Sequence, residues 1–280
     1  MSGKNKLLFV FLILFLNTIV AAQEFRVMYN YSFKKDSTNN FVESEMMVLD
    51  TEDKGSVFYS YPKYKYDSIS IAKHKKNENV VEADNSKIQF FVEKKYPNFE
   101  LVFHTTLGST NYAVNDSTKI KWKLEPERKI LKGFPVQKAI ANFGNRDWVA
   151  WYSKEIPIND GPFKFFGLPG LILEIEDSKS NHKFEFLGIE KNSYGYNNFF
   201  KINKLNEKEL SSEDFNKQWK IYKKDPAKDT KFSLLNSKLG YSINYDGKDY
   251  SISDMIRIEE ERQKEKIKRD NNFIELSLYK

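Results

Sequence analysis

The stretch from Phe163 to Asp177 reads FKFFGLPGLILEIED, an apolar run that passes into a two-residue alternation. From Leu173 to Glu176 apolar and acidic residues alternate, which is the pattern of a β-strand with one buried face. A turn-forming sequence, DSKSN, follows, and a second alternation, KFEF, occupies residues 183–186. The sequence therefore predicts a β-hairpin with one buried face.

A bend is predicted just before this hairpin, where Gly167, Pro169 and Gly170 interrupt the apolar run. Proline lacks the N–H that a central strand donates, and glycine adopts backbone angles closed to other residues. Apolar neighbours, among them Phe165 and Phe166, are expected to pack the bend into the core. The stretch is thus interpreted as a structural corner that carries no reactive group.

Short segments of the same kind dominate residues 25–189. They are rich in β-branched and aromatic residues, and Asp, Asn, Gly, Ser or Pro separates them. We therefore expect a mainly β, α+β fold built on a curved antiparallel sheet or half-barrel. The cleanest alternation, IKWKLE at residues 120–125, predicts a strand with Ile120, Trp122 and Leu124 on one face.

The C-terminal third predicts helices that follow the sheet. A serine stands three residues before an acid in residues 211–214, and Phe215, Trp219 and Tyr222 recur at helical spacing. Core packing of this aromatic stripe is favoured over ligand binding. A second helix is predicted over residues 254–270, where charges dominate; simple solvation is favoured there over a partner surface.

The first 22 residues have the pattern of a secretory signal peptide, with lysines, an apolar block over residues 7–16 and cleavage expected after Ala22. A retained anchor is disfavoured, because the block is shorter than the roughly 20 residues of a membrane-spanning helix. No later stretch reaches that length. We expect an exported protein in the periplasm or at the periphery of the outer membrane, with no transmembrane segment after cleavage.

Composition narrows the function classes. The chain has no cysteine, which excludes disulfides, cysteine nucleophiles and thiolate metal sites. Cleavage would remove two of 45 basic residues and none of 39 acidic ones, which leaves a net charge of +4. This small excess of positive charge does not indicate nucleic-acid binding. Residues 23–280 are long enough for one core, so we expect a single domain in which residues 200–280 form a helix-containing elaboration.

The hexapeptide GLPGLI at residues 167–172 is the signature of the GLPGLI family, exported proteins of Bacteroidetes-type bacteria, and the chain resembles this family. The resemblance also covers FPVQKA at 134–139, AWY at 150–152, and the approach from Glu155 to Phe163. It implies no established activity. The motif residues are expected to be structural: Gly167, Leu168, Pro169, Gly170, Leu171 and Ile172.

The order of elements is also similar to periplasmic lipoprotein carriers, whose curved sheets hold acyl chains on a concave apolar face covered by helices. This resemblance implies a hydrophobic ligand or an envelope protein as partner. Trp151, Tyr152, Phe165 and Phe166 are the residues we expect to line the binding face. For Trp151, core packing is the favoured alternative.

Reactive chemistry finds little support in the sequence. His74, His104 and His182 are isolated, without metal-binding spacing, and no Gly-x-Ser-x-Gly elbow occurs. Asp160, in the sequence NDGP, is expected to form a turn rather than act as an acid or base. We therefore expect no cofactor, no metal and a non-enzymatic protein. The alternatives are an accessory protein at the outer membrane acting through its C-terminal helix, and a hydrolase with a dispersed site.

Overall fold

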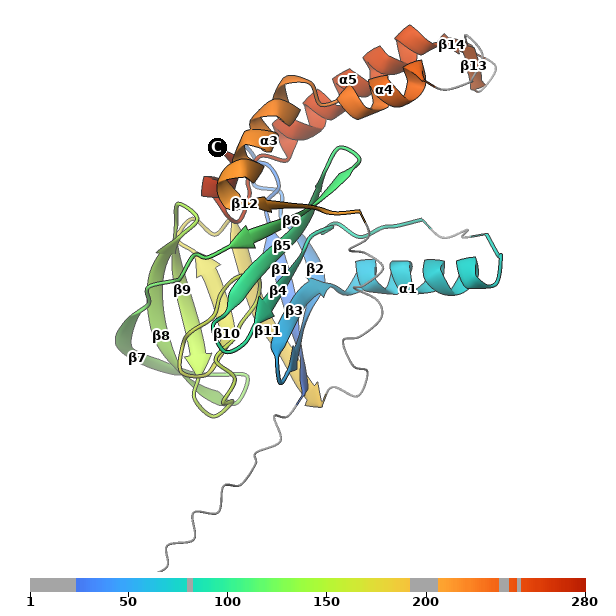
Figure 1. Ribbon diagram of the computed structural model, residues 1–280. Coiled ribbons are helices and arrows are strands. Elements are labelled where there is room, and N and C mark those ends of the chain that lie inside the picture. The colour runs from blue at the N-terminus through green and yellow to red at the C-terminus, as the bar shows by residue number, and fades with distance from the viewer. Residues whose placement is uncertain (1–23, 80–82, 192–205, 237–241, 246–247) are drawn as a thin grey trace, which may run out of the picture.

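The computed structural model describes residues 24–79, 83–191, 206–236, 242–245 and 248–280 (Figure 1). The predicted signal peptide lies outside these residues. A large curved sheet forms the body of the protein, and α3, α4 and α5 lie toward one end of its strands (Figure 1). Among the described residues, no helix combines the length and apolarity needed to cross a membrane.

The main sheet contains twelve strands in the described residues. They are β1 (Phe25–Phe33), β2 (Glu43–Glu52), β3 (Gly55–Ser60), β4 (Phe91–Lys95), β5 (Glu100–Leu107), β6 (Thr110–Asp116), β7 (Lys123–Leu131), β8 (Phe134–Phe143), β9 (Arg146–Ser153), β10 (Leu171–Asp177), β11 (His182–Lys191) and β12 (Lys208–Ser211). The helices are α1 (Tyr61–Lys75), α3 (Ser212–Lys224), α4 (Lys228–Leu235), α5 (Ile252–Arg269) and the 3₁₀ helix η1 (Leu276–Tyr279). A separate hairpin pairs β13 (Ser242–Tyr245) with β14 (Lys248–Ser251).

The strands lie in the order β12-β6-β5-β4-β3-β2-β1-β11-β10-β9-β8-β7. Neighbours are antiparallel except β12, which runs parallel to β6. The chain builds the sheet outward from β1 to β6, passes to the opposite edge at β7, and returns until β11 pairs with β1. This architecture confirms the predicted mainly β, α+β fold with C-terminal helices.

The predicted strand at residues 120–125 is wrong in its first half. Residues 117–122 form no strand, β7 begins only at Lys123, and Leu124 is 47% exposed. The reason is topological: the segment links β6 to β7, which lie near opposite edges of the sheet, so no strand runs beside it. Ile120 and Trp122 still pack against the core, and this packing explains their alternation with exposed lysines.

Helix α1 departs from the prediction that short strands dominate residues 25–189. The hydroxyl of Ser60, the last residue of β3, accepts the N–H of Lys63 at 3.1 Å and caps the new helix. Pro62 stands in the first turn, where its missing N–H costs nothing. The apolar side chains of this helix are not gathered on one face, so it lacks the periodic stripe by which helices are identified in sequences.

The predicted C-terminal helices are confirmed as α3 and α5. The hydroxyl of Ser211 accepts the N–H of Asp214 at 3.1 Å, and Phe215 and Trp219 are buried, as core packing requires. Helix α4 packs along α5, and the two project from the sheet as an arm that ends at the β13–β14 hairpin (Figure 1).

The core lies on the inner face of the sheet and is largely aromatic. Tyr31 stacks on Phe184 with ring centroids 4.2 Å apart, while Phe58 meets Phe184 edge to face at 5.7 Å. Burying one such ring contributes roughly 1.5–3 kcal/mol. A smaller cluster on the outer face joins Val48, Val57 and Tyr59 to side chains of α1. The sheet is therefore covered on both faces where α1 lies.

Candidate functional site

The corner at residues 167–172 is tightly packed. Gly167 and Gly170 have φ angles of +89° and +138°, which side chains rarely tolerate. A Cβ atom on Gly170 would lie 2.0 Å from the backbone oxygen of Ser153, whereas one on Gly167 would meet nothing within 4 Å. The N–H of Gly170 donates to the oxygen of Leu168 at 2.8 Å and closes a tight bend. Strand β10 starts directly after this bend, and the predicted hairpin follows as β10 and β11.

The four residues predicted to line a binding face do not gather around one hollow. Tyr152 and Phe165 are fully buried, and Phe166 stacks on Phe99 at 4.4 Å. Trp151 is half-buried on the other face of β9, where the ammonium of Lys129 lies 4.2 Å from its ring centroid. Alternation along β9 thus separates Trp151 from Tyr152. A ligand-binding role for these residues stays a prediction.

An apolar cavity of about 180 Å³, here called the inner cavity, lies between the inner face of the sheet and the C-terminal segment 270–279. Aromatic rings dominate its lining, which includes Phe33, Phe90, Phe103, Phe163, Phe273 and Tyr279. Phe163 belongs to the approach to the GLPGLI corner, and Phe165 packs behind it with ring centroids 6.2 Å apart. One of the predicted lining residues therefore forms a second layer behind this cavity.

A buried lysine sits beside the inner cavity. The ammonium of Lys164 lies 2.7 Å from the carboxylate of Asp116 and 2.6 Å from that of Glu275. Burial raises the pKa of Glu275, and the ammonium offsets this only in part. Burial also acts to raise the pKa of Asp116, but Lys164 outweighs it and holds that pKa below its ordinary value. The three groups fasten the C-terminal segment to the sheet.

A second buried network holds the same segment. The guanidinium of Arg146 donates to the side chains of Asp177 and Asn272, at 3.1 and 2.5 Å, and to the backbone oxygen of Phe273 at 2.8 Å. His182 lies nearby, with Nδ1 2.8 Å from the hydroxyl oxygen of Tyr31. Burial, reinforced by Arg146, lowers the pKa of His182 to about 3. The imidazole beside the cavity is therefore neutral at physiological pH.

Asp160 occupies a richer environment than a turn. It accepts the N–H of Gly161 at 2.7 Å, as the turn prediction requires. Its fully buried carboxylate also accepts hydrogen bonds from Ser56 and Tyr96 and pairs with the buried ammonium of Lys94. Both carboxylate oxygens are thus engaged by donors, and the cluster ties the loop before the GLPGLI corner to β3 and β4. We interpret it as a structural lock, because the carboxylate is fully buried and both of its oxygens are engaged.

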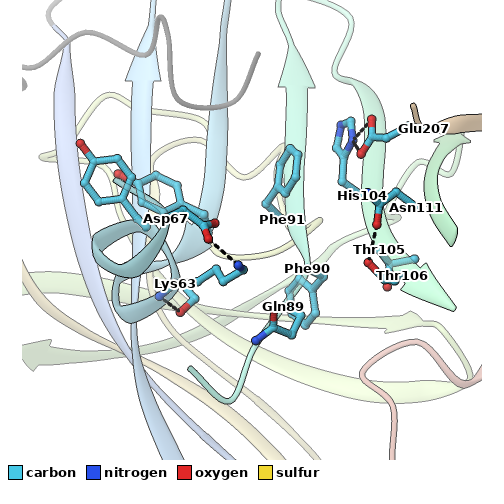
Figure 2. A pocket seen from close by; sticks show the side chains of 13 residues that line it. Lys63, Asp67, Gln89, Phe90, Phe91, His104, Thr105, Thr106, Asn111 and Glu207 are labelled. Atoms are coloured by element: carbon cyan, nitrogen blue, oxygen red, sulfur yellow. Dashed lines mark hydrogen bonds and ion pairs between the residues drawn. The ribbon is translucent and has the colours of Figure 1, made fainter. Parts of the chain in front are cut away.

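A polar hollow of about 190 Å³, here called the α1 cleft, opens on the outer face between α1 and strands β4 and β5 (Figure 2). Four aromatic side chains contribute to its wall, namely Tyr59, Tyr64, Phe90 and Phe91. Polar groups complete the lining, among them Lys63, Asp67, Gln89, Thr106, Asn111 and Glu207. No local sequence signal indicates this cleft, because α1 was not predicted and the other wall comes from distant strands.

His104 stands in the α1 cleft between two carboxylates. Its Nδ1 lies 2.9 and 3.0 Å from the two oxygens of Glu207, its Nε2 lies 3.3 Å from Glu93, and its ring stacks on Phe91 at 4.1 Å. Burial acts to lower the pKa of His104, but the bonds to Glu207 and Glu93 outweigh it and raise that pKa above 6.5. A structural role for the isolated histidines stays a prediction, and His74 is exposed on α1.

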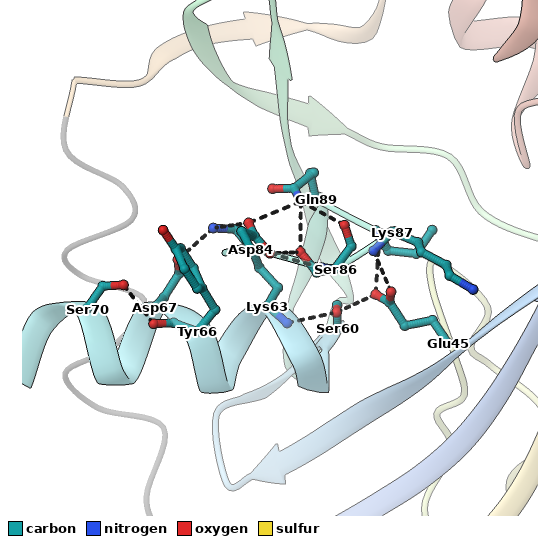
Figure 3. Close-up of polar contacts among 11 residues, drawn as sticks. Glu45, Ser60, Lys63, Tyr66, Asp67, Ser70, Asp84, Ser86, Lys87 and Gln89 are labelled. Carbon is teal, nitrogen blue, oxygen red and sulfur yellow. Dashed lines mark hydrogen bonds and ion pairs between the residues drawn. The ribbon is translucent and has the colours of Figure 1, made fainter. Parts of the chain in front are cut away.

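The walls of the α1 cleft are braced by a polar network (Figure 3). The carboxylate of Glu45 accepts a hydrogen bond from the capping hydroxyl of Ser60 and from the backbone N–H groups of Lys87 and Ile88, at 2.5 and 3.1 Å. Lys63 reaches across to Asp84 at 3.4 Å. The start of α1 and the segment that leads into β4 are therefore fixed relative to each other.

Part of the chain matches a known protein family. Residues 137–174, which include the GLPGLI corner, match the sequence model of a family described as a protein of unknown function (Porph_ging). This match is consistent with a Bacteroidetes-type family, while assignment to the GLPGLI family stays a prediction. No curated protein matches the chain significantly.

Solved structures show distant similarity. The structure of PNGF-II in space group P21 aligns over 68% of this chain and 32% of its own chain, at 17% sequence identity and a TM-score of 0.47. The structure of PNGF-II in space group C2 aligns over 68% of this chain and 31% of its own chain, at 16% sequence identity and a TM-score of 0.46. A putative outer membrane lipoprotein-sorting protein domain from Vibrio parahaemolyticus aligns over 65% of this chain and 90% of its own chain, at 7% sequence identity and a TM-score of 0.30. The chain spans about a third of the PNGF-II chains, and TM-scores this low support no argument about function.

Proposed function

We propose that this is an exported, non-enzymatic protein of the cell envelope that binds a small hydrophobic group in the inner cavity. The observation that carries the proposal is the aromatic lining of a hollow on the inner face of the sheet. Charged groups beside it, Lys164 and Arg146, are engaged by carboxylates and backbone oxygens. His182 is neutral there, so the site offers packing surface rather than a reactive group.

The size of the inner cavity limits the ligand. At about 180 Å³ it is smaller than the roughly 300–1,000 Å³ of typical small-molecule sites. A short acyl terminus or one apolar side chain of a partner protein matches this volume. A longer acyl chain requires the C-terminal segment 270–279 to move, and the buried contacts of Glu275 and Asn272 oppose that movement.

Native mass spectrometry of the chain purified from a periplasmic extract tests this proposal, followed by calorimetric titration with octanoate. Leu278 lines the cavity and is 3% exposed, so Leu278→Trp should fill the hollow and abolish both the bound mass and octanoate binding. Leu187→Trp, at a residue 50% exposed on β11, is the matched control and should leave both unchanged. Absence of any bound mass together with absence of octanoate binding would overturn the proposal.

A second candidate is an accessory role at the outer membrane through the C-terminal helices. It is favoured by exposed apolar side chains on the arm: Phe232 and Leu235 of α4 are 72% and 69% exposed, and Ile258 of α5 is 45% exposed. Deleting the C-terminal helix is a poor test, because Ile274 and Leu278 after it belong to the core. Cross-linking in cells, comparing the parent chain with Phe232→Ser, is a better test. If the variant loses one defined cross-linked neighbour, this role is supported, and if the cross-linked proteins are unchanged, it is contradicted.

A further inference from the structure

We propose that the α1 cleft is a second binding site, specific for a neutral saccharide unit. It lies on the outer face of the sheet, whereas the inner cavity lies on the inner face, although Phe90 lines both hollows. The proposal does not rest on the hydrophobic-ligand function. The cleft offers room for about six water molecules at roughly 30 Å³ each, which is enough for a ring-sized group.

The aromatic wall supplies the apolar half of such a site. Tyr59 of β3 and Tyr64 of α1 contribute, with ring centroids 5.5 Å apart. Phe91 contributes from the start of β4 (Figure 2). Phe90 also lines the cleft, although its ring centroid lies 5.5 Å from that of Phe163 on the inner side. Sugar rings present apolar C–H faces between their hydroxyl groups, and aromatic rings are the side chains best suited to cover such faces.

The polar groups of the cleft suit hydroxyl groups. The side chains of Gln89 and Asn111 both donate and accept, Thr106 does the same through its hydroxyl, and Asp67 and Glu207 accept. A sugar hydroxyl also donates and accepts, so it can bond to every member of this set. An apolar ligand would instead displace the water that these groups can still bond, and would leave them only the bonds they already make in the cleft, such as that from Thr106 to Asn111 at 2.9 Å.

The paired charges of the cleft favour a neutral ligand. Each charged side chain that the described residues place on the cleft has an opposite partner within 3 Å: Lys63 pairs with Asp67 at 2.6 Å, and Glu207 with His104 at 2.9 Å. Lys63 also faces Asp84 at 3.4 Å, and Glu93 lies 3.3 Å behind His104. A phosphate or carboxylate ligand would have to compete with these pairs for the cations, so the site favours uncharged groups.

Backbone pairing argues against an extended peptide as the ligand. Strand β4 forms ladders with both β3 and β5, and β5 also pairs with β6. Peptides that bind to sheets add a strand at an open edge, and these strands present none to the cleft. Recognition there must come from side chains, as it does for a sugar.

The bracing of the cleft walls supports binding. Glu45 and Ser60 lock the first turn of α1 to the segment before β4, and Asp84 accepts the N–H of Ser86 at 3.0 Å (Figure 3). A site whose walls are already fixed loses little entropy when a ligand binds.

Saturation-transfer NMR tests the proposal on the full chain, with methyl glucoside, methyl mannoside and N-acetylglucosamine as probes at millimolar concentration. Asn111→Ala removes one polar contact from a partly exposed position and should weaken binding roughly 3- to 10-fold, as loss of one hydrogen bond does. Tyr64→Leu removes one ring and should also weaken it. Asn98→Ala, beside a different hollow, is the matched control and should change nothing.

Each other outcome overturns the proposal. If no probe gives a signal, the cleft is no saccharide site. If a probe binds but neither Asn111→Ala nor Tyr64→Leu weakens it, the sugar binds elsewhere on the chain. If N-acetyltyrosinamide binds and the sugars do not, the cleft recognises a protein side chain instead. Thermal unfolding of both variants must match that of the parent chain, and Gln89→Ala at an exposed position replaces any variant that unfolds early.

Discussion

The ammonium of Lys164 lies 2.6 Å from the carboxylate of Glu275, although 111 residues separate them in the chain. Lys164 stands in the approach to the GLPGLI corner, and Glu275 in the segment that closes the inner cavity. Both side chains are buried, and Asp116 completes the cluster from β6. One buried cation thus joins the end of β6, the approach to the corner and the C-terminal segment that covers the cavity.

Replacing Lys164 by an uncharged residue should lower the free energy of unfolding. Lys164→Met leaves two buried carboxylates without their cation, and breaking a buried ion pair in this way costs about 3–5 kcal/mol. Urea denaturation of the variant should show this loss in the free energy of unfolding. Lys179→Met, at an exposed turn residue, is the control and should change it by less than about 0.5 kcal/mol. A loss below about 1 kcal/mol for Lys164→Met would contradict a structural role for the cluster.

Glycines of the corner should differ in their tolerance of a methyl group. Gly170→Ala meets the backbone oxygen of Ser153 at 2.0 Å in addition to an unfavourable φ, so we expect a loss of more than about 3 kcal/mol. Gly167→Ala and the control Gly133→Ala have φ angles of +89° and +88° and nothing within 4 Å, so each should lose only about 1–2 kcal/mol. Equal losses at all three positions in thermal or urea unfolding would show that the close approach to Ser153 does not matter.

The His104 network should make stability depend on pH. The folded-state pKa of His104 is raised, because its bonds to Glu207 and Glu93 outweigh burial. Its contribution is therefore fully present below the unfolded value of about 6.5 and is lost as pH rises through the folded pKa. The free energy of unfolding of the parent chain, minus that of His104→Gln, should fall across this window. A difference that is flat or that grows with pH would contradict the arrangement.

Local pattern alone was enough to predict much of the fold. The hairpin after the GLPGLI corner, the bend before it and the start of α3 at Ser211 each depend on residues within a few positions of one another. Alternation predicts which face of a strand is buried, and a serine three residues before an acid predicts a helix start, because both follow from backbone geometry that repeats over two to four residues.

Tertiary structure alone decided the rest. Lys94 and Asp160 are 66 residues apart, His104 and Glu207 are 103 apart, and no local periodicity encodes such pairs. The alternation at residues 120–122 looked like a strand because packing on a core imposes the same pattern on any extended segment, with or without a neighbouring strand. The α1 cleft and the inner cavity arise where distant segments meet, and their chemistry depends on the burial that only the assembled sheet provides.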